Sequence, residues 1–250
     1  MSPATPFTYE VPCTQCPLRA CGVFRELSDE EIGFVSSLKT GEIRAGPGAT
    51  LLQEGQPSDN LFTLLEGWAF RSKTLSDGRR QITNFVLPGD FVGLQGSIQG
   101  AMEHSVETLT NAVFCTFPRA RVWQLFSRAP SLAFDLTWLA AREERILDEN
   151  LLSLGRRSAE ERAGYYLLHL YVRAGDIGLV TEGRVRFPFT QQHLADALGL
   201  SLVHTNKTLK RLARRGLIQW EHGWFFLPDI AALAELATFD LDAPRKRPLL

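Results

Sequence analysis

The chain has 250 residues, of which 44% are hydrophobic and 22% charged, and its formal net charge is −1. This length favours two domains, and the composition is that of a folded protein rather than a disordered one. A near-neutral charge argues against a protein that coats nucleic acid by bulk positive charge. Because no run of about 18 apolar residues and no secretory signal pattern is present, we expect a cytoplasmic protein without a membrane span.

Residues 1–27 are predicted to form a separate cysteine-containing segment. Prolines at positions 3, 6, 12 and 17 interrupt it, so a long regular element is not expected there. Cys13, Cys16 and Cys21 lie within this segment, whereas Cys115 lies far along the chain. In a cytosolic protein, such clustering indicates metal or redox chemistry before a structural disulfide.

Residues 28–128 are predicted to form a β domain that begins with a short helix. Ser28 and Glu31 have the spacing of a capping box at the start of that helix. From about residue 41 to 118, short apolar stretches alternate with turn signals, and Asp77-Gly78 is predicted to form a hairpin turn. This pattern is typical of a sandwich or a small barrel. A second short helix is expected from about residue 119 to 126.

Residues 129–156 are predicted to contain one long helix, since 131–154 holds no glycine or proline. An apolar stripe at near-heptad spacing runs along it, and we interpret this stripe as a dimerisation face. The alternative is a helix that packs on its own β domain. The predicted dimerisation residues are Leu132, Leu136, Leu139, Ile146, Leu147 and Leu154.

Residues 157–236 are predicted to form a winged helix-turn-helix domain. Ser158 begins a helix with a second capping box, Thr190 begins a helix that ends at Leu198, and Gly199 makes the turn to a helix capped by Ser201. Two short strands around 221–223 are expected to form the wing. Residues 237–250 are expected to be a disordered tail.

The second helix of this motif is predicted to enter the major groove of DNA. Its inward face is expected to consist of Leu202, Thr205, Leu209 and Leu212, and no acidic residue lies between positions 201 and 216. The outward side chains offer amide and cationic donors for base edges and phosphates. The predicted DNA-binding residues are Ser201, Val203, His204, Asn206, Lys207, Lys210, Arg211 and Arg214.

The ordered set of motifs resembles the Crp/Fnr family over nearly the whole chain. The motifs are Leu61-Phe-Thr-Leu-Leu-Glu-Gly, Pro88-Gly-Asp-Phe-Val-Gly, Ser158-Ala-Glu-Glu-Arg and Leu194-Ala-Asp-Ala-Leu-Gly-Leu-Ser. The resemblance implies an α+β fold: a cyclic-nucleotide-binding-like β-roll (a jelly roll), a long dimerisation helix and a C-terminal winged helix-turn-helix. It also implies a homodimer on two-fold symmetric double-stranded operator DNA, and a contact with RNA polymerase.

Two features of the family do not carry over directly. The oxygen-sensing branch reads bases with a glutamate, a serine and an arginine, and the aligned residues are Val203, Asn206 and Lys207, so its operator preference cannot be transferred. The cAMP-binding branch uses a glutamate and an arginine-serine pair, and the aligned residues are Leu94 and His104-Ser105. Leucine accepts no hydrogen bond and histidine is mostly neutral near pH 7, so cAMP is not expected as a ligand.

The cysteine pattern resembles the ligand set of the oxygen-sensing Fnr branch. There, three cysteines near the N-terminus and one from the β-roll hold a [4Fe-4S] cluster. The resemblance implies the same role for Cys13, Cys16, Cys21 and Cys115. A structural zinc, a thiol–disulfide switch, or a regulator without any cofactor would be compatible with the same residues.

Two other classes of function are alternatives to a DNA-binding regulator. A metal-dependent enzyme is not expected, because the histidines are scattered without ligand spacing and no acid–base pair or phosphate-binding loop is evident. A sensor module that acts through protein partners, without DNA, is the remaining alternative. The basic outward face of the second helix favours a DNA-binding regulator over both.

Overall fold

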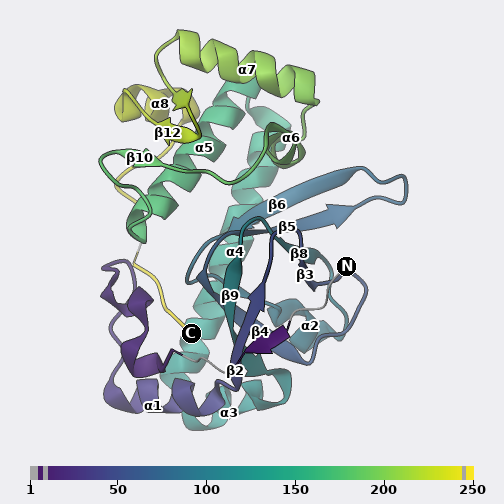
Figure 1. Cartoon of the computed structure of the whole chain (residues 1–250), viewed down its shortest axis with the longest axis vertical. Helices are drawn as coiled ribbons and strands as arrows, with labels where there is room; N and C mark the ends of the chain where they lie inside the picture. Colours follow the sequence, from purple (N-terminus) through teal and green to yellow (C-terminus); the bar gives the residue numbers. More distant parts are fainter. Residues whose placement is uncertain (1–4, 8–10, 244–245) are drawn as a thin grey trace. The chain divides into compact units, whose positions relative to one another are not determined.

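The computed structural model describes residues 5–7, 11–243 and 246–250, and the chain divides into two compact units (Figure 1). Unit 1 takes in residues 1–73, 85–145 and 246–250, and unit 2 takes in residues 74–84 and 146–245. Positions 1–4, 8–10 and 244–245, which belong to the predicted cysteine segment and the predicted tail, lie outside this description. Among the described helices, none is both long and apolar enough to cross a membrane.

The first part of unit 1 contains only short elements among its described residues, in agreement with the expectation that prolines prevent a long regular element there. Strand β1 (Thr5–Phe7) pairs antiparallel with β2 (Gly41–Ala45), and two 3-10 turns follow, η1 (Cys13–Gln15) and η2 (Pro17–Ala20). Helix α1 (Asp29–Leu38) begins with the predicted capping box. The Glu31 amide donates to the Ser28 hydroxyl, and the Ser28 amide donates to the Glu31 carboxylate at 2.9 Å.

Two antiparallel sheets form the β-roll of unit 1. One sheet has the strand order β1-β2-β9-β4-β7 and the other β3-β8-β5-β6. The strands not yet introduced are β3 (Thr50–Leu52), β4 (Asn60–Glu66), β5 (Ala69–Thr74), β6 (Arg80–Val86), β7 (Phe91–Val92), β8 (Ser105–Thr108) and β9 (Ala112–Pro118). The predicted hairpin at Asp77-Gly78 therefore joins β5 to β6, and its residues 74–84 group with unit 2.

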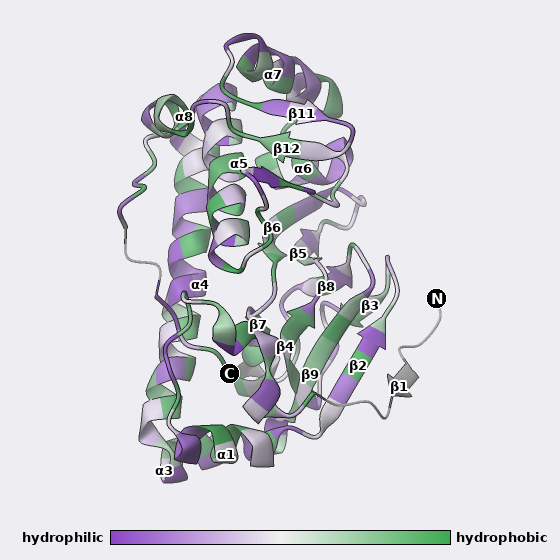
Figure 2. Ribbon diagram, turned by 60° about the vertical axis from the view of Figure 1, so that its left-hand side comes forward, coloured by the Kyte–Doolittle hydropathy of each residue, from purple (hydrophilic) through white to green (hydrophobic). Residues whose placement is uncertain are grey.

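A core of aliphatic and aromatic side chains fills the β-roll. Phe62, Leu64, Val106 and Phe114 are buried there, and β4 and β9 are apolar over much of their length (Figure 2). Gly67, directly after β4, has a φ of 91°, and a Cβ at this position would lie 2.3 Å from the Asn111 carbonyl oxygen. Only glycine fits this turn without displacing the backbone.

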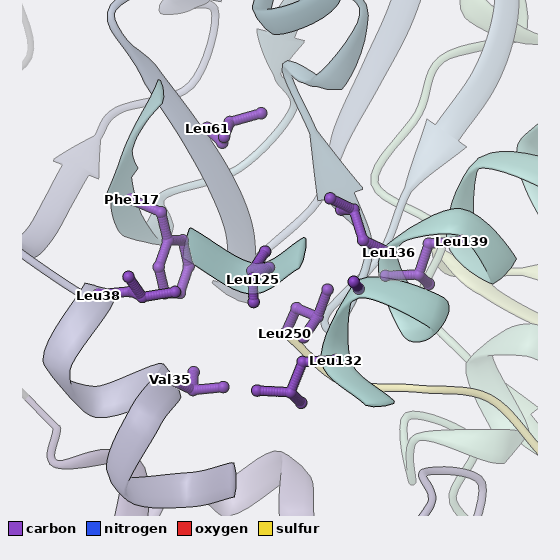
Figure 3. Close-up of a cluster of buried hydrophobic side chains, with 10 residues drawn as sticks. Val35, Leu38, Leu61, Phe117, Leu125, Leu132, Leu136, Leu139 and Leu250 are labelled. Atoms are coloured by element: carbon purple, nitrogen blue, oxygen red, sulfur yellow. The ribbon is translucent and has the colours of Figure 1, made fainter. Parts of the chain in front are cut away.

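A second core cluster in unit 1 joins α1 and the sheet to helices α3 (Val122–Arg128) and α4 (Pro130–Arg156). Figure 3 shows these side chains converging from several elements. The cluster consists of Val35, Leu38, Leu61, Phe117, Leu125, Leu132, Ala133, Leu136, Leu139 and Leu250. A short helix, α2 (Leu94–Gln99), follows β7.

Helix α4 confirms the long helix but corrects the predicted dimerisation face. Leu132, Leu136 and Leu139 pack in the core cluster of their own chain, which was the alternative to pairing with a second subunit. Ile146 is buried too, so the prediction is wrong for these four residues. Leu147 and Leu154 are exposed, and so are Phe134, Leu151 and Leu152, which are not in the predicted dimerisation set.

Unit 2 contains the predicted helix-turn-helix and wing. Helix α5 (Ala159–Asp176) starts with the predicted Ser158–Glu161 capping box, and α6 (Gln191–Leu198) and α7 (Leu202–Arg214) follow. The wing strands are β11 (Gln219–Glu221) and β12 (Trp224–Phe226), and β10 (Arg184–Val185) adds a third strand that was not predicted. Helix α8 (Ile230–Ala237) completes the unit.

The segment predicted as a disordered tail is partly ordered. Residues 246–250 group with unit 1, and Arg247, Leu249 and Leu250 are each at most 9% exposed. Apolar burial and a buried ion pair hold these residues in place. The expectation of disorder is therefore wrong for 246–250.

Candidate functional site

The helix-turn-helix is built by three local signals. Thr190 caps α6, with its hydroxyl accepting from the His193 amide and its own amide donating to His193 Nδ1, each at 3.2 Å. Gly199 takes a left-handed conformation with φ 62°, which ends α6 without the steric cost another residue would meet. The Ser201 hydroxyl then accepts from the His204 amide at 3.2 Å and caps α7.

The inward face of α7 largely matches the prediction. Thr205, Leu209 and Leu212 are buried as expected. Leu202 is 40% exposed, so its assignment to the packed face was wrong, because it lies in the first turn of the helix. Thr208 is fully buried and was missed, although it lies three residues after Thr205 on the same face.

The outward face of α7 presents most of the predicted DNA-binding residues together. Val203 is 65% exposed, and Asn206 is half-buried at the edge of the packed face. The exposed members of the predicted set are Ser201, Val203, His204, Lys207, Lys210, Arg211 and Arg214. This face can offer hydrogen bonds to base edges, ammonium and guanidinium groups to phosphates, and one apolar contact to a thymine methyl.

Two cations at the C-terminal end of α7, Arg211 and Arg215, form ion pairs with Glu160 on α5. Glu160 Oε1 lies 3.3 Å from Arg211 Nη1, and its Oε2 lies 2.9 Å from Arg215 Nη1. Both guanidinium groups are about half exposed, at 50% and 51%. Arg211 therefore has a carboxylate partner that the sequence did not reveal.

The wing carries cations that the sequence analysis did not select. Arg184 and Arg186 are both exposed. The Arg184 guanidinium lies 5.5 Å from the centre of the Phe226 ring, and that of Arg186 lies 4.7 Å from the Trp224 ring. Such stacking holds a guanidinium in a fixed direction while leaving its donors available for phosphate oxygens.

The predicted cysteine set is partly brought together in unit 1. Cys115 lies on β9, opposite Glu42 on β2 and Thr63 on β4. Cys13 and Cys16 line the same apolar pocket as Cys115, and Cys21 is not among the described residues that line it. All four cysteine side chains are half-buried.

The surroundings of Cys13, Cys21 and Cys115 favour the protonated form of these three thiols. Burial raises the pKa of Cys115 to about 12, although the Lys39 ammonium acts in the opposite direction. Burial also raises the pKa of Cys13 and of Cys21. The Lys39 ammonium is held by Glu42, with 2.8 Å between Nζ and Oε1, so its charge is largely neutralised.

We tested whether the four cysteines fit an iron–sulfur cluster. Four thiolates are the right donors in kind, and Cys13, Cys16 and Cys115 converge on one pocket. Among the described residues, however, no three His, Cys, Asp or Glu side chains are grouped closely enough to hold a metal ion. The residues as arranged do not fit a cluster. Most of the side chains that line the pocket are aliphatic, and Cys21 is not among the described residues that line it with the other three thiols.

Two family models match the chain. A model of the cyclic nucleotide-binding domain matches residues 42–129, and one of the Crp-like helix-turn-helix domain matches residues 161–236. The transcriptional activatory protein AadR of Rhodopseudomonas palustris is 32% identical over 212 residues, covering 85% of this chain and 86% of that protein. The nitrogen fixation regulation protein FixK of Bradyrhizobium diazoefficiens is 31% identical, covering 90% and 93%.

The chain belongs to the Crp/Fnr family of transcription regulators. The transcriptional activator protein FnrL of Cereibacter sphaeroides is also similar, at 29% identity over 94% of this chain and 97% of that protein. The solved structure of FixK2 from Bradyrhizobium japonicum has a TM-score of 0.72 and 26% identity, covering 79% of this chain and 96% of that one. As a Crp/Fnr protein, the chain is a DNA-binding transcription factor and not an enzyme.

The positions that hold cAMP in one branch of the Crp/Fnr family have a different chemistry here. Leu94 opens helix α2, and His104 is only 5% exposed. Burial and the nearby charges of Arg71 and Lys73 lower the pKa of His104 to about 3. A neutral imidazole at this position cannot supply the cation that pairs with a cyclic phosphate.

Proposed function

We propose that this Crp/Fnr protein is a homodimeric, sequence-specific regulator whose β-roll senses a redox or oxygen signal through its cysteines. The observation that carries the DNA-binding part is the outward face of α7, where exposed cations and Asn206 lie beside a packed inward face. On this proposal the protein acts on double-stranded operator DNA in the cytoplasm and contacts RNA polymerase, as the family resemblance implies.

Self-association is proposed through the exposed apolar face of α4. Leu147, Leu151 and Leu154 recur at helical spacing of three or four residues, and Leu151 is 69% exposed. Exposed apolar side chains in such a row are typical of a helix that pairs with its copy.

The sensing part of the proposal depends on Cys13, Cys16, Cys21 and Cys115. The resemblance to the Fnr branch favours a [4Fe-4S] cluster, whereas the described arrangement would have to change before these thiols could hold one. Three thiols that line one pocket support chemistry between the cysteines themselves, and because burial keeps Cys13 and Cys115 protonated, this chemistry requires a change that exposes them.

DNA binding is tested by removing single charges from α7. Each of Lys207→Ala and Lys210→Ala should reduce the slope of log Kobs against log salt by about 2, because each removes one phosphate contact from each subunit of the dimer. Fluorescence anisotropy with a duplex selected from a random library, measured at several salt concentrations, gives this slope. Arg128→Ala, at an exposed position of α3, is the matched control. Unchanged slopes in both α7 variants would contradict the DNA-binding assignment.

The cofactor is tested by anaerobic purification followed by iron, sulfide and zinc analysis. About four irons and four sulfides per chain, lost in air, would support a cluster at the four cysteines. One zinc per chain would support a structural metal. If neither metal is present after attempted reconstitution, reversible oxidation of the thiols must change DNA affinity, and an affinity that does not respond to oxidation contradicts redox sensing.

A further inference from the structure

Residues 246–250 form a bound peptide within unit 1. The Arg247 amide donates to the Val23 carbonyl oxygen, and the Arg25 amide donates to the Arg247 carbonyl oxygen, both at 2.8 Å. These two bonds make a parallel β-bridge between Phe24 and Arg247. The segment is therefore held by its backbone next to the cysteine-containing part of the chain.

The guanidinium group of Arg247 is bound by a carboxylate, that of Asp90, and by an aromatic ring, that of Phe24. Arg247 Nη1 lies 2.6 Å from Asp90 Oδ1, and the two side chains are only 5% and 3% exposed. Its guanidinium also lies 4.7 Å from the centre of the Phe24 ring. Both partners of Arg247 are held in place. Asp90 Oδ2 accepts a hydrogen bond from the Leu87 amide at 2.8 Å. The Phe24 ring packs so closely on Gly89 that a Cβ at Gly89 would lie 2.2 Å from Phe24 Cζ. A buried, charge-assisted pair of this kind selects arginine strongly.

The two leucines of the segment lie in the pocket of the thiols. Leu249 and Leu250 line the same pocket as Cys13, Cys16 and Cys115. Leu250 also belongs to the core cluster shown in Figure 3. The Leu250 carbonyl oxygen accepts a hydrogen bond from Thr63, the residue opposite Cys115 across β4 and β9.

We propose that residues 246–250 act as an intramolecular gate, which covers the pocket of Cys13, Cys16 and Cys115 and exposes these thiols when it leaves. This inference deepens the redox sensing proposed above, because it identifies what controls access to the cysteines. Leu249 and Leu250 occupy the pocket beside the three thiols, so their departure would enlarge the space through which a reagent, metal or cluster reaches these thiols. On this proposal, the ligand of the site is a segment of the same chain with the pattern Arg-Pro-aliphatic-aliphatic, residues 247–250.

The test measures thiol reactivity alone, under anaerobic conditions and without DNA. The alkylation rate of each cysteine by iodoacetamide is followed by peptide mass spectrometry in the full chain and in a variant without residues 246–250. We expect the rates of Cys13, Cys16 and Cys115 to rise at least tenfold in the variant, while that of Cys21 changes less than twofold. Arg247→Glu should act in the same direction, and Lys246→Ala, at an exposed position, should have no effect.

Unchanged rates at the three pocket thiols in the shortened variant would overturn the gate, whatever is found for oxygen or DNA. If the variant unfolds, all four cysteines react faster, and hydrogen exchange in the intact chain then decides. Slow exchange of the Arg247 and Arg25 amides, which are hydrogen-bonded in the docked state, supports the gate. Exchange of both amides at the rate of an unstructured peptide overturns it.

Discussion

The guanidinium of Arg80 donates two hydrogen bonds to Asp196 Oδ2, at 3.0 Å from Nε and 2.8 Å from Nη2. Arg80 lies on the β5–β6 hairpin and Asp196 on α6, the first helix of the DNA-binding motif. Gln81 adds a bond from Nε2 to the Ala197 carbonyl oxygen at 3.0 Å. The hairpin whose turn the sequence predicted thus holds the helix that positions α7.

Arg80→Ala should lower the free energy of unfolding by about 1–2 kcal/mol, because it leaves Asp196, 14% exposed, without its charged partner. Chemical denaturation monitored by circular dichroism measures this change. Arg79→Ala is the matched control, since Arg79 is 77% exposed and pairs within the turn with Asp77, and a change within about 0.5 kcal/mol is expected. Equal losses in the two variants would contradict a special role for Arg80.

Glu160→Gln should strengthen non-specific DNA binding. The substitution frees Arg211 and Arg215 from their shared carboxylate, so more positive charge is available to phosphates. We expect a severalfold gain in affinity for a random duplex at low salt, and a steeper salt dependence. Glu235→Gln on α8 makes the same charge change at an exposed position and controls for net charge. A gain of equal size in the control would assign the effect to net charge alone.

The burial of neutral His104 should make the folded protein less stable in mild acid. The His104 pKa of about 3 in the folded chain is below the ordinary value of about 6.5, so the unfolded chain binds more protons between these values. Stability therefore falls as the pH drops below about 6.5, by up to about 2 kcal/mol between pH 7 and pH 5. His104→Gln should reduce this dependence in urea denaturation at the two pH values. His222→Gln, at an exposed position of the wing, should leave it unchanged.

Leu151→Glu should weaken self-association, because it places a charge in the exposed apolar row of α4. We expect sedimentation velocity to show a shift toward monomer, together with weaker binding to a two-fold symmetric duplex. Leu75→Glu, at a position that is 58% exposed on the β5–β6 hairpin, is the matched control. A sedimentation coefficient that is identical for Leu151→Glu and the control would place the dimer contact elsewhere.

Local signals in the sequence predicted local structure well. The capping residues Ser28, Ser158, Thr190 and Ser201 all cap helices as expected, because each acts on amides within three residues of itself. The packed face of α7 followed from helical periodicity. A periodic stripe cannot identify its partner, however, and this is why Leu132 and its neighbours were assigned to a second subunit rather than to their own β-roll.

These local signals could not predict contacts between residues that lie far apart in the sequence. Arg247 and Asp90 are 157 positions apart, and neither lies in a motif that indicates the other. The prolines and charges before Leu249 had the composition of a disordered tail, which gave no sign of a buried anchor. The cysteine spacing likewise predicted a shared site but not that aliphatic side chains would occupy it.

The docking of residues 246–250 also changes the topology of the chain. The polypeptide leaves unit 1 after Arg145, within α4, and belongs to it again from Lys246. Residues 146–245 are therefore an insertion in the chain of unit 1 while the segment is bound, and residues 74–84 of unit 2 are a second, shorter one. Release of residues 246–250 would free the C-terminal end of the longer insertion and raise the conformational entropy of the chain that follows α8. Local undocking beside the thiols would thus relax a constraint on the part of the protein that carries the DNA-reading helix.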